Sequence, residues 1–271
     1  MPKHAPLPIV DHATQKALLS RLVREFGQGR QPLRILEAGC GRRWPLDLGD
    51  TRFALTGVDI DRTSLEARRV LEGDLDETIL GDLRAIELPS AGFDVIYSSY
   101  VLEHIKGAER VLDNFARWLT RDGLILIMIP DRDTVWGFVT RVTPYWLHVA
   151  FKRYIQRVHN AGEPGFGPFP TYHDRIVSRR GIHYWCVRNS FEVVLERGRQ
   201  FRPRRLGVLI RTVTKILAMV SLGRLYAHYN DVILVLRPME RERTFIAPIA
   251  LTRIVAPHAP SPDLTAVAPE E

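Results

Sequence analysis

The sequence predicts an α/β fold with a doubly wound, mostly parallel sheet, and three observations support this prediction. Compact apolar runs recur at residues 33–36, 53–61, 93–99 and 123–130. A helical pattern of apolar residues fills residues 101–119, between the last two runs. The first run stops at a glycine turn, as a buried parallel strand does. Ligands of such sheets bind where strands end in loops, so these loops are expected to line one crevice.

An amphipathic helix is expected to precede the first strand. Apolar residues recur at helical spacing within residues 11–27, and Gly27 and Gly29 end the pattern. These apolar positions are Ala17, Leu18, Leu19, Leu22, Val23 and Phe26.

After Pro130 the alternation of strands and helices stops. Residues 131–190 hold Trp, Tyr, His, Gly and Pro in irregular order, which predicts a cap inserted over the crevice. Regular patterns return in the helix-like residues 190–198 and the strand-like residues 231–238, which are expected to complete the sheet with an antiparallel far edge. An amphipathic helix is expected between them, at residues 208–226.

The chain is therefore expected to divide into four parts. Residues 1–130 form a ligand-binding core, 131–190 form the cap, and 191–240 complete the sheet and add the amphipathic helix. Residues 241–271 are rich in Pro and Ala with little periodicity, which predicts a disordered tail.

Composition excludes several classes of protein. The 271 residues are 45% hydrophobic, enough for a sizeable core, which excludes a disordered or fibrous chain. The two cysteines, Cys40 and Cys186, cannot form a disulfide framework or a four-cysteine zinc site, and no metal site is expected. No apolar run has the length of a signal peptide or of a membrane span. We therefore expect a cytoplasmic protein that does not cross a membrane.

The net charge of +7 is concentrated in one segment. Residues 141–224 carry 16 Lys and Arg against 4 Asp and Glu, whereas residues 1–140 carry 18 against 21. Aromatic residues gather in nearly the same place, with 13 of the 24 Phe, Trp and Tyr in residues 135–201. A phosphate-bearing substrate, a nucleic acid or a membrane surface would each suit such a basic segment, which can also serve solubility alone.

Glycines and an acidic residue follow the first two predicted strands in a pattern typical of nucleoside binding. Gly39 and Gly41 lack a Cβ, so the backbone can turn sharply and approach a ligand closely. Asp59 lies 20 residues after Gly39, at the end of the second strand, where a carboxylate can accept hydrogen bonds from ribose hydroxyls. The dinucleotide fingerprint needs a small residue where Trp44 stands, which argues against NAD and FAD.

These motifs resemble the class I S-adenosylmethionine-dependent methyltransferases of the small-molecule, type 11-like kind. The resemblance covers about residues 30–130 and rests on the segments LEAGCG, GVDI, GD, FDVI and LEH. It implies a Rossmann-like fold and S-adenosylmethionine as the cofactor. It also implies that the cofactor contacts residues at the ends of four strands, namely Glu37, Gly39, Gly41, Asp59, Asp82, Leu83, Ser98 and Ser99.

Within the resemblance, each strand end has its own role. The turn with Glu37, Gly39 and Gly41 would hold the methionine part, and Asp59 would hold the ribose. Asp82 would lie beside the adenine, with a backbone contact from Leu83. The residues at the end of the fourth strand, Ser98, Ser99 and Tyr100, would lie next to the reactive methyl group. The carboxylates suit a cationic sulfonium and would repel a pyrophosphate. The chain departs from the family at Arg43, where a small residue is usual, and at Pro45, which shortens or displaces the following helix.

The chemistry of the methyl acceptor is narrowed by exclusion. Residues 98–101 read Ser-Ser-Tyr-Val and lack the Asn/Asp-Pro-Pro-aromatic motif of base N-methylation, and Cys186 is too far along the chain for cytosine C5 chemistry. Nucleic acid is thus disfavoured, and O-methylation of a small hydroxylated metabolite, a sugar or a glycolipid is expected. The alternatives are a catalytically inactive methyltransferase-like binding protein and an RNA methyltransferase.

Candidate proton acceptors are His104, Asp131, His173 and His183, because imidazole and carboxylate groups can take a proton near neutral pH. Of these, His104 and His173, with Tyr172, are the predicted catalytic residues, whereas His148 and His183 are more typical of packed histidines. Residues 169–172, Phe-Pro-Thr-Tyr, resemble the cap of bacterial methyltransferases of cell-envelope synthesis, which would suit a glycoconjugate acceptor.

The predicted helix at residues 208–226 has a broad apolar face with Arg211, Lys215 and Arg224 beside it. It can either pack against the fold or contact an anionic membrane from the cytoplasmic side. Packing is the commoner role of such a helix, so the sequence leaves both possibilities open.

Overall fold

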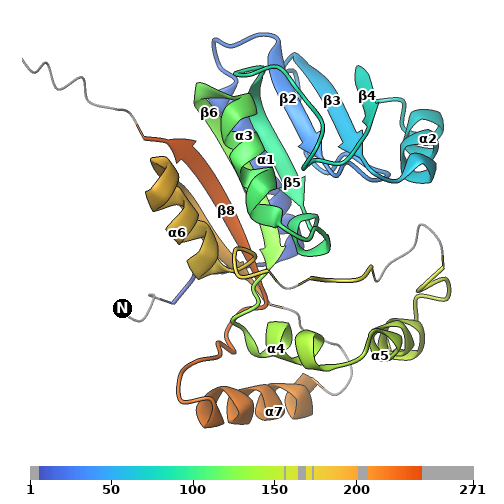
Figure 1. Ribbon diagram of the computed structural model, residues 1–271, viewed down its shortest axis with the longest axis vertical. Helices are drawn as coiled ribbons and strands as arrows, with labels where there is room; N and C mark the ends of the chain where they lie inside the picture. The colour runs from blue at the N-terminus through green and yellow to red at the C-terminus, as the bar shows by residue number, and fades with distance from the viewer. Residues whose placement is uncertain (1–5, 156, 164–168, 173, 201–206, 240–271) are drawn as a thin grey trace, which may run out of the picture. The chain divides into compact units, whose positions relative to one another are not determined.

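The computed structural model describes residues 6–155, 157–163, 169–172, 174–200 and 207–239. Within them, one sheet of eight strands has the order β1-β7-β8-β6-β5-β2-β3-β4 (Figure 1). Strands β2 to β6 run parallel, while β8 runs antiparallel to both β6 and β7. The strands are β1 (Ile9–Val10), β2 (Leu33–Ala38), β3 (Phe53–Asp59), β4 (Glu77–Leu80), β5 (Phe93–Ser99), β6 (Leu119–Pro130), β7 (Phe191–Arg199) and β8 (Asp231–Pro238).

The helices of the described residues are α1 (His12–Phe26), α2 (Arg62–Leu71), α3 (Ala108–Trp118), α4 (Val135–Val142), α5 (Tyr145–Ala150), α6 (Arg179–Asn189) and α7 (Gly207–Val220). A short 3-10 helix, η1 (Leu102–His104), follows β5, and a π-helical turn, η2 (Phe151–Ile155), follows α5. Among the described residues, no helix combines the length and apolar character needed to cross a membrane.

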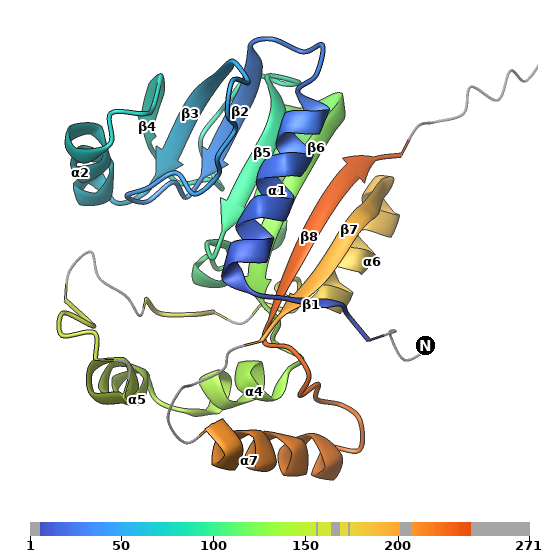
Figure 2. The same ribbon diagram turned by 180° about the vertical axis from the view of Figure 1, so that it is seen from behind.

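Two apolar clusters lie on opposite faces of the sheet, because successive strand residues point to opposite sides. Leu36, Ile96 and Ile125 belong to the cluster that also holds α3 and α6 residues, on the face seen in Figure 1. Ile35 and Val95, each one residue away along its strand, belong to the cluster of α1, on the face seen in Figure 2. The sheet is therefore covered by helices on both sides, as the predicted doubly wound fold requires.

The strand order places a switch point between β2 and β5. From β2 the sheet grows through β3 and β4 to one edge, and β5 then returns to the other side of β2. The loops after β2 and β5 consequently diverge, which opens a crevice at the carboxyl ends of these strands. Helices α4, α5 and α7 lie beyond the same strand ends in both views (Figures 1 and 2).

The structure confirms the predicted strands at 93–99 and 231–238 and the predicted helix at 11–27. This helix begins after Asp11, and the Asp11 side chain caps it by accepting a hydrogen bond from the backbone N–H of Thr14. It divides the single helix expected at 101–119 into η1 and α3, because Gly107 adopts a left-handed φ of +77°. The prediction of a helix at residues 190–198 is wrong. Those residues form β7, which pairs with β8 on one side and with β1 on the other.

Within its described residues, the expected cap at 131–190 forms the helices α4, α5 and α6 and the π-helical turn η2. Its last helix, α6, packs on the sheet, where Ile182 and Trp185 are fully buried in the cluster that also holds Phe115 of α3. The boundaries at 130 and 190 therefore remain predictions, and the predicted tail, 241–271, lies outside the described residues.

Both cysteines are free and buried. Cys40 lies in the glycine turn after β2 and Cys186 on α6. Burial raises the pKa of each thiol to about 12, so both remain protonated at neutral pH.

Candidate functional site

A cavity of about 540 Å³ lies at the carboxyl ends of β2, β3, β4 and β5, and we call it the first cavity. Most of the predicted site residues line it, namely Gly39, Gly41, Asp59, Asp82, Leu83, Ser99, His104 and Tyr172. Among the described residues, Glu37 and Ser98 do not line it, so cofactor contact by these two remains a prediction. His173 lies outside the described residues.

The glycine turn needs the conformational freedom of its two glycines. Gly39 has a φ of +76°, and a Cβ at this position would overlap the side chain of Val101. Gly41 has a φ of +55°, and a Cβ there would meet no atom within 4 Å. The first glycine therefore lets the loops after β2 and β5 approach each other, and the second leaves open space beside the cavity.

Asp59 joins the glycine turn to the end of β3. Its Oδ2 accepts a hydrogen bond from the backbone N–H of Gly41 at 2.8 Å, and its Oδ1 accepts one from the N–H of Asp61 at 2.9 Å. A carboxylate has about four acceptor positions, so the Asp59 carboxylate can still accept hydrogen bonds from a ligand.

A fully buried arginine, Arg68 of α2, supports the glycine turn from inside the fold. It donates a hydrogen bond to the carbonyl oxygen of Cys40 at 2.7 Å and forms ion pairs with Glu37 at 2.7 Å and with Asp74 at 2.9 Å. Burial raises the pKa of Glu37, while the nearby guanidinium of Arg68 opposes this rise. Glu37 thus acts on the turn through Arg68.

Polar contacts also fix the loop after β4, which is predicted to contact the adenine. Asp82 forms an ion pair with Arg84 at 2.5 Å, and the hydrogen bonds from Arg84 hold the pKa of the Asp82 carboxyl below its usual value. The carbonyl oxygen of Leu83 accepts a hydrogen bond from the side-chain amide of Asn114 at 2.8 Å. The loop after β4 is therefore fixed to α3.

The loop 39–52 contains no helix, whereas Pro45 was expected only to shorten or displace one. Instead, Leu46 and Leu48 are buried in the cluster of α1, and the ring of Trp44 packs against Tyr97 with a centroid distance of 5.5 Å. Trp44 thus fills the space beside the sheet rather than the first cavity.

A second cavity of about 520 Å³ adjoins the first, and three residues, Tyr100, His104 and Phe169, line both. The other lining residues come from η1, from the end of β6 and the residues after it, from the region of α4, α5 and η2, and from the segment before α6. They are Glu103, Pro130, Arg132, Gly137, Thr140, His148, Lys152, Thr171 and Val177. A molecule in the second cavity can therefore reach a ligand in the first.

Tyr100 stands at this junction in a strained conformation, with a φ of +57°. Its hydroxyl donates a hydrogen bond to Asp231 at 2.9 Å, and Asp231 forms an ion pair with Arg199 at 2.8 Å. Burial raises the pKa of Tyr100 far above its usual value, so the phenol stays protonated. Contacts to β7 and β8 thus position a residue at the end of β5.

His104 has one ring nitrogen available at the junction. Its Nδ1 donates a hydrogen bond to the carbonyl oxygen of Pro170 at 2.7 Å, since a carbonyl can only accept. Burial lowers the pKa of His104, so the neutral ring carries its proton on Nδ1 and a lone pair on Nε2. The Nε2 atom of His104 lies 3.8 Å from Oε1 of Glu103. The other predicted catalytic residue that the structure describes, Tyr172, is half exposed, and its backbone N–H donates a hydrogen bond to the carbonyl oxygen of Glu103.

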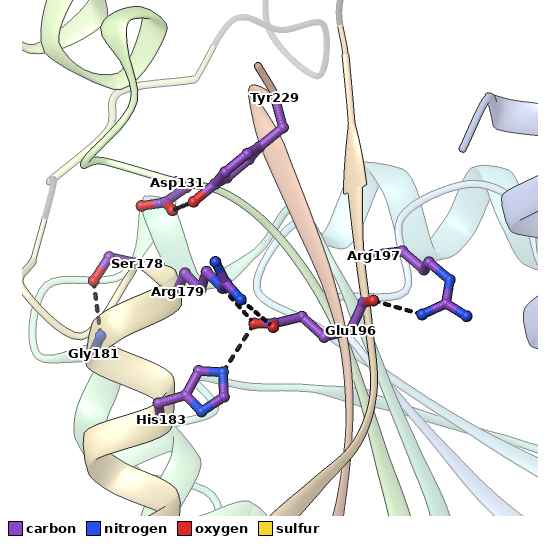
Figure 3. A network of polar contacts seen from close by, with 8 residues as sticks. All are labelled: Asp131, Ser178, Arg179, Gly181, His183, Glu196, Arg197 and Tyr229. Atoms are coloured by element: carbon purple, nitrogen blue, oxygen red, sulfur yellow. Dashed lines mark hydrogen bonds and ion pairs between the residues drawn. The ribbon is translucent and has the colours of Figure 1, made fainter. Parts of the chain in front are cut away.

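Two other candidate proton acceptors belong to a separate network, shown in Figure 3. Asp131 accepts a hydrogen bond from the Tyr229 hydroxyl at 2.6 Å, and burial raises the pKa of its carboxyl to about 6. His183 contacts Glu196 at 2.9 Å, and Arg179 donates two hydrogen bonds to the same carboxylate. Among the described residues, neither Asp131 nor His183 lines either cavity, so this network connects α6 to the sheet.

Sequence patterns assign no role to Glu103, Arg132 and Lys152 of the second cavity. Glu103 stands in the quoted LEH motif, directly after a predicted strand, which is the one local signal for it. Lys152 lies in the basic segment, and Arg132 lies before that segment begins. No spacing rule places the two residues together, because 20 residues and two helices separate them.

The family of proteins with a methyltransferase domain matches residues 10–196 of the chain. A probable S-adenosylmethionine-dependent methyltransferase of Mycobacterium tuberculosis is 32% identical over 101 residues, which cover 37% of this chain and 36% of that protein. Phosphatidylethanolamine N-methyltransferase of Cereibacter sphaeroides is 30% identical over 100 residues, 35% of this chain and 49% of that protein. The matched part therefore spans less than half of each relative.

Two solved structures are similar in fold. A SAM-dependent methyltransferase from Archaeoglobus fulgidus has a TM-score of 0.51 and 17% identity, over 83% of this chain and 94% of that chain. A protein from Galdieria sulphuraria that is described as a sarcosine dimethylglycine methyltransferase has a TM-score of 0.52 and 12% identity, over 84% of this chain and 86% of that chain. These similarities confirm the Rossmann-like α/β fold.

Proposed function

Because the chain belongs to the family of proteins with a methyltransferase domain, we propose that it transfers the methyl group of S-adenosylmethionine to an oxygen atom of a small acceptor in the second cavity. The observation that carries this proposal is the junction of the two cavities at Tyr100, His104 and Phe169. Methyl transfer needs the acceptor atom, the methyl group and the sulfur in line, and a junction of this kind allows that alignment.

The first cavity fits S-adenosylmethionine in size and in chemistry. Its volume of about 540 Å³ lies within the usual range of small-molecule sites. The open space at Gly41 allows a ligand to approach the backbone, and Asp59 retains acceptor positions for ribose hydroxyls. Among the described residues, three carboxylates, Asp59, Asp61 and Asp82, line the cavity against two cations, Arg84 and Lys106, and Arg84 is paired with Asp82. The remaining negative charge suits a sulfonium.

When bound, S-adenosylmethionine supplies an electrophilic methyl group. The chain's own contribution is to orient the acceptor and to remove its proton. Neutral His104 can accept the hydroxyl proton at Nε2, while the hydrogen bond from Nδ1 to Pro170 stabilises the imidazolium that forms. The new bond joins the acceptor oxygen to the methyl carbon as the bond from that carbon to sulfur breaks.

The test uses labelled methyl groups and fractionated cell extract. Wild-type protein is expected to label a small molecule or a glycoconjugate. His104→Gln should lower the rate by about 10²- to 10⁴-fold, the usual contribution of a general base, with unchanged cofactor affinity. His159→Gln is the matched control, because His159 is exposed and lines neither cavity. An unchanged rate in His104→Gln would show that His104 is not the base.

The same experiment separates the alternatives. Label in RNA, with binding that weakens steeply as salt rises, would favour an RNA methyltransferase. Cofactor binding without any labelled product would favour an inactive binding protein. Label on a nitrogen atom would overturn the proposed O-methylation and leave methyl transfer intact.

We further propose that α7 contacts an anionic membrane surface. Helix α7 packs on α4, yet Val213, Ile216 and Met219 are exposed, with Met219 at 73%. Lys215 on the same helix and Arg224 just after it are exposed cations that can meet anionic headgroups. One relative is named for a phospholipid acceptor, phosphatidylethanolamine, which also supports a location at a membrane.

A further inference from the structure

We propose that the second cavity binds an acceptor that carries a phosphate group, and that Arg132 and Lys152 hold this phosphate. The inference rests on the proposed function, because it takes the second cavity as the acceptor site. It adds the chemical class of the acceptor, and one relative is named for an acceptor that carries a phosphate, phosphatidylethanolamine.

The two cations reach the cavity from different elements. Arg132 follows β6, and Lys152 lies in η2. No hydrogen bond or ion pair of the described residues involves either side chain, although both are partly buried. Burial lowers the pKa of Lys152, and it also lowers the pKa of Arg132, where Arg141 adds a smaller repulsion. Asp133 and Asp174 attract Arg132, but neither lies within ion-pair distance of it. Two partly buried positive charges without a direct ion pair are unfavourable, and a bound anion would reduce that cost.

Glu103 is the acidic residue among those that line the second cavity, but it does not neutralise the two cations. Its side chain is 4% exposed, and its Oε2 atom has no hydrogen-bond partner in the structure. Burial raises the pKa of Glu103 to about 8, so the carboxyl is mostly protonated and uncharged at pH 7. The positive charge of Arg132 and Lys152 is thus available to a ligand.

The arrangement also orients such a ligand. Arg132 and Lys152 line only the second cavity, whereas Tyr100, His104 and Phe169 line both. A phosphate beside the two cations would leave the rest of the acceptor to extend toward the junction, where the unpartnered Glu103 carboxyl and His104 Nε2 can contact its hydroxyl. A phosphate monoester carries close to two negative charges at pH 7, which matches two cations better than a single carboxylate does.

The direct test is calorimetric titration of inorganic phosphate into the full chain saturated with S-adenosylhomocysteine, at constant ionic strength. Phosphate should bind the wild type, and acetate should bind more weakly. Lys152→Gln and Arg132→Gln should each weaken phosphate binding by about tenfold, as expected for loss of a charge-assisted contact. Arg121→Gln is the matched control, because Arg121 is exposed and does not line the cavity.

Several results would overturn the inference. These are a wild type that does not bind phosphate, acetate binding as tight as phosphate binding, and full phosphate affinity in both the Lys152→Gln and Arg132→Gln variants. Circular dichroism of each variant verifies that it is folded. This titration needs no methyl transfer, so absent transfer with intact phosphate binding would refute the proposed function alone, and the reverse result would refute the phosphate site alone.

The source of the phosphate follows from the labelled extract. Label in the aqueous fraction that disappears after phosphatase treatment identifies a soluble phosphate ester. Label in the lipid fraction that phospholipase C releases with the headgroup identifies a phospholipid. Both outcomes support the inference, whereas label in a compound without phosphate contradicts it.

Discussion

At the scale of single residues, Arg68 shows how a buried charge supports a binding loop. Its neighbour Arg69 is exposed, and the helical phase of α2 alone decides which of the two arginines faces Glu37, Asp74 and Cys40. The residues that contact a ligand and the residue that holds their loop are therefore different, although they are close in the sequence.

Arg68→Met should destabilise the fold by about 3 to 5 kcal/mol, because it leaves Glu37 buried without its cation. Urea unfolding at pH 7 measures this change, with Arg69→Met as the exposed control. A cost below about 1 kcal/mol for Arg68→Met would contradict this account.

Asp59→Ala should weaken the binding of S-adenosylmethionine by about 1.5 to 3 kcal/mol, or roughly 10- to 150-fold in Kd, because hydrogen bonds to a charged acceptor are lost. The loss includes any loosening of the glycine turn, because the backbone N–H of Gly41 donates a hydrogen bond to the Asp59 carboxylate. Calorimetry measures the affinity, and Glu66→Ala on the exposed side of α2 is the control. Equal affinity in wild type and Asp59→Ala would remove Asp59 from the site.

Much of the first cavity could be predicted from the sequence, because Gly39, Gly41 and Asp59 follow or end two strands with clear apolar runs. Asp82 follows β4, which has no such run, and only the family resemblance predicted it. Strand alternation explains why only one of two adjacent serines lines it, Ser99, while Ser98 is buried. The second cavity could not be predicted in this way, since it is built from loops and helices whose meeting depends on tertiary packing.

At the scale of elements, α6 and β7 show where local pattern misleads. Residues 190–198 contain Val193, Val194 and Leu195 in a row with flanking charges, which fits a helix or a strand. Pairing with β8 and β1 decides in favour of the strand, and it places Glu196 opposite Arg179 and His183 of α6.

Glu196 should make stability depend on pH. Burial alone would raise its pKa, but the hydrogen bonds from His183 and Arg179 lower it to about 2. A lowered pKa in the folded state stabilises the protein above the ordinary pKa near 4.5, and this contribution disappears as the pH falls from about 4.5 to 2. At pH 7, Glu196→Gln should therefore cost on the order of 2 kcal/mol, after allowance for solvent screening.

Urea unfolding at several pH values measures the difference between wild type and Glu196→Gln. Glu192→Gln is the control, because Glu192 lies on the same strand and forms an exposed ion pair with Arg237. A difference for Glu196→Gln that stays constant from pH 7 to pH 2 would contradict the assigned shift.

The proposed contact of helix α7 with an anionic membrane can be tested with lipid vesicles. Wild-type protein should float with anionic vesicles at low salt, and high salt should weaken this binding because it screens surface charge. Met219→Glu with Val220→Glu should abolish flotation, while Val70→Glu with Leu71→Glu, equally exposed on α2, should not. Wild-type protein that stays unbound at low salt would refute the membrane proposal.

At the scale of the whole molecule, the fold class followed from the apolar runs because buried parallel strands leave a strong signal in sequence. The exposed strand β4, with the residues ETIL, and the two-residue β1 leave none, and both were missed. The cap helices were missed as well, because α5 is short and its Tyr145 and Trp146 are exposed, so no clear apolar face marks it.

Ligand binding should stabilise the entire described fold, since the first cavity joins loops from four strands. S-adenosylmethionine at about 100 times its Kd should add about 2.7 kcal/mol, which raises the unfolding midpoint by several degrees. NAD should cause no shift, because Trp44 stands where the dinucleotide-binding loop needs a small residue. Differential scanning fluorimetry compares the two ligands, and a larger shift with NAD would overturn the cofactor assignment.

The two buried cysteines place one protected thiol in the glycine turn and another on α6. An alkylating reagent can reach either sulfur only while its segment is open, so the rate at which each cysteine is modified measures a local opening equilibrium. Peptide mass spectrometry distinguishes the two sites in one sample. The natural sequence thus carries two intrinsic probes of its own fluctuations, and a ligand in the first cavity should slow the alkylation of Cys40 more than that of Cys186.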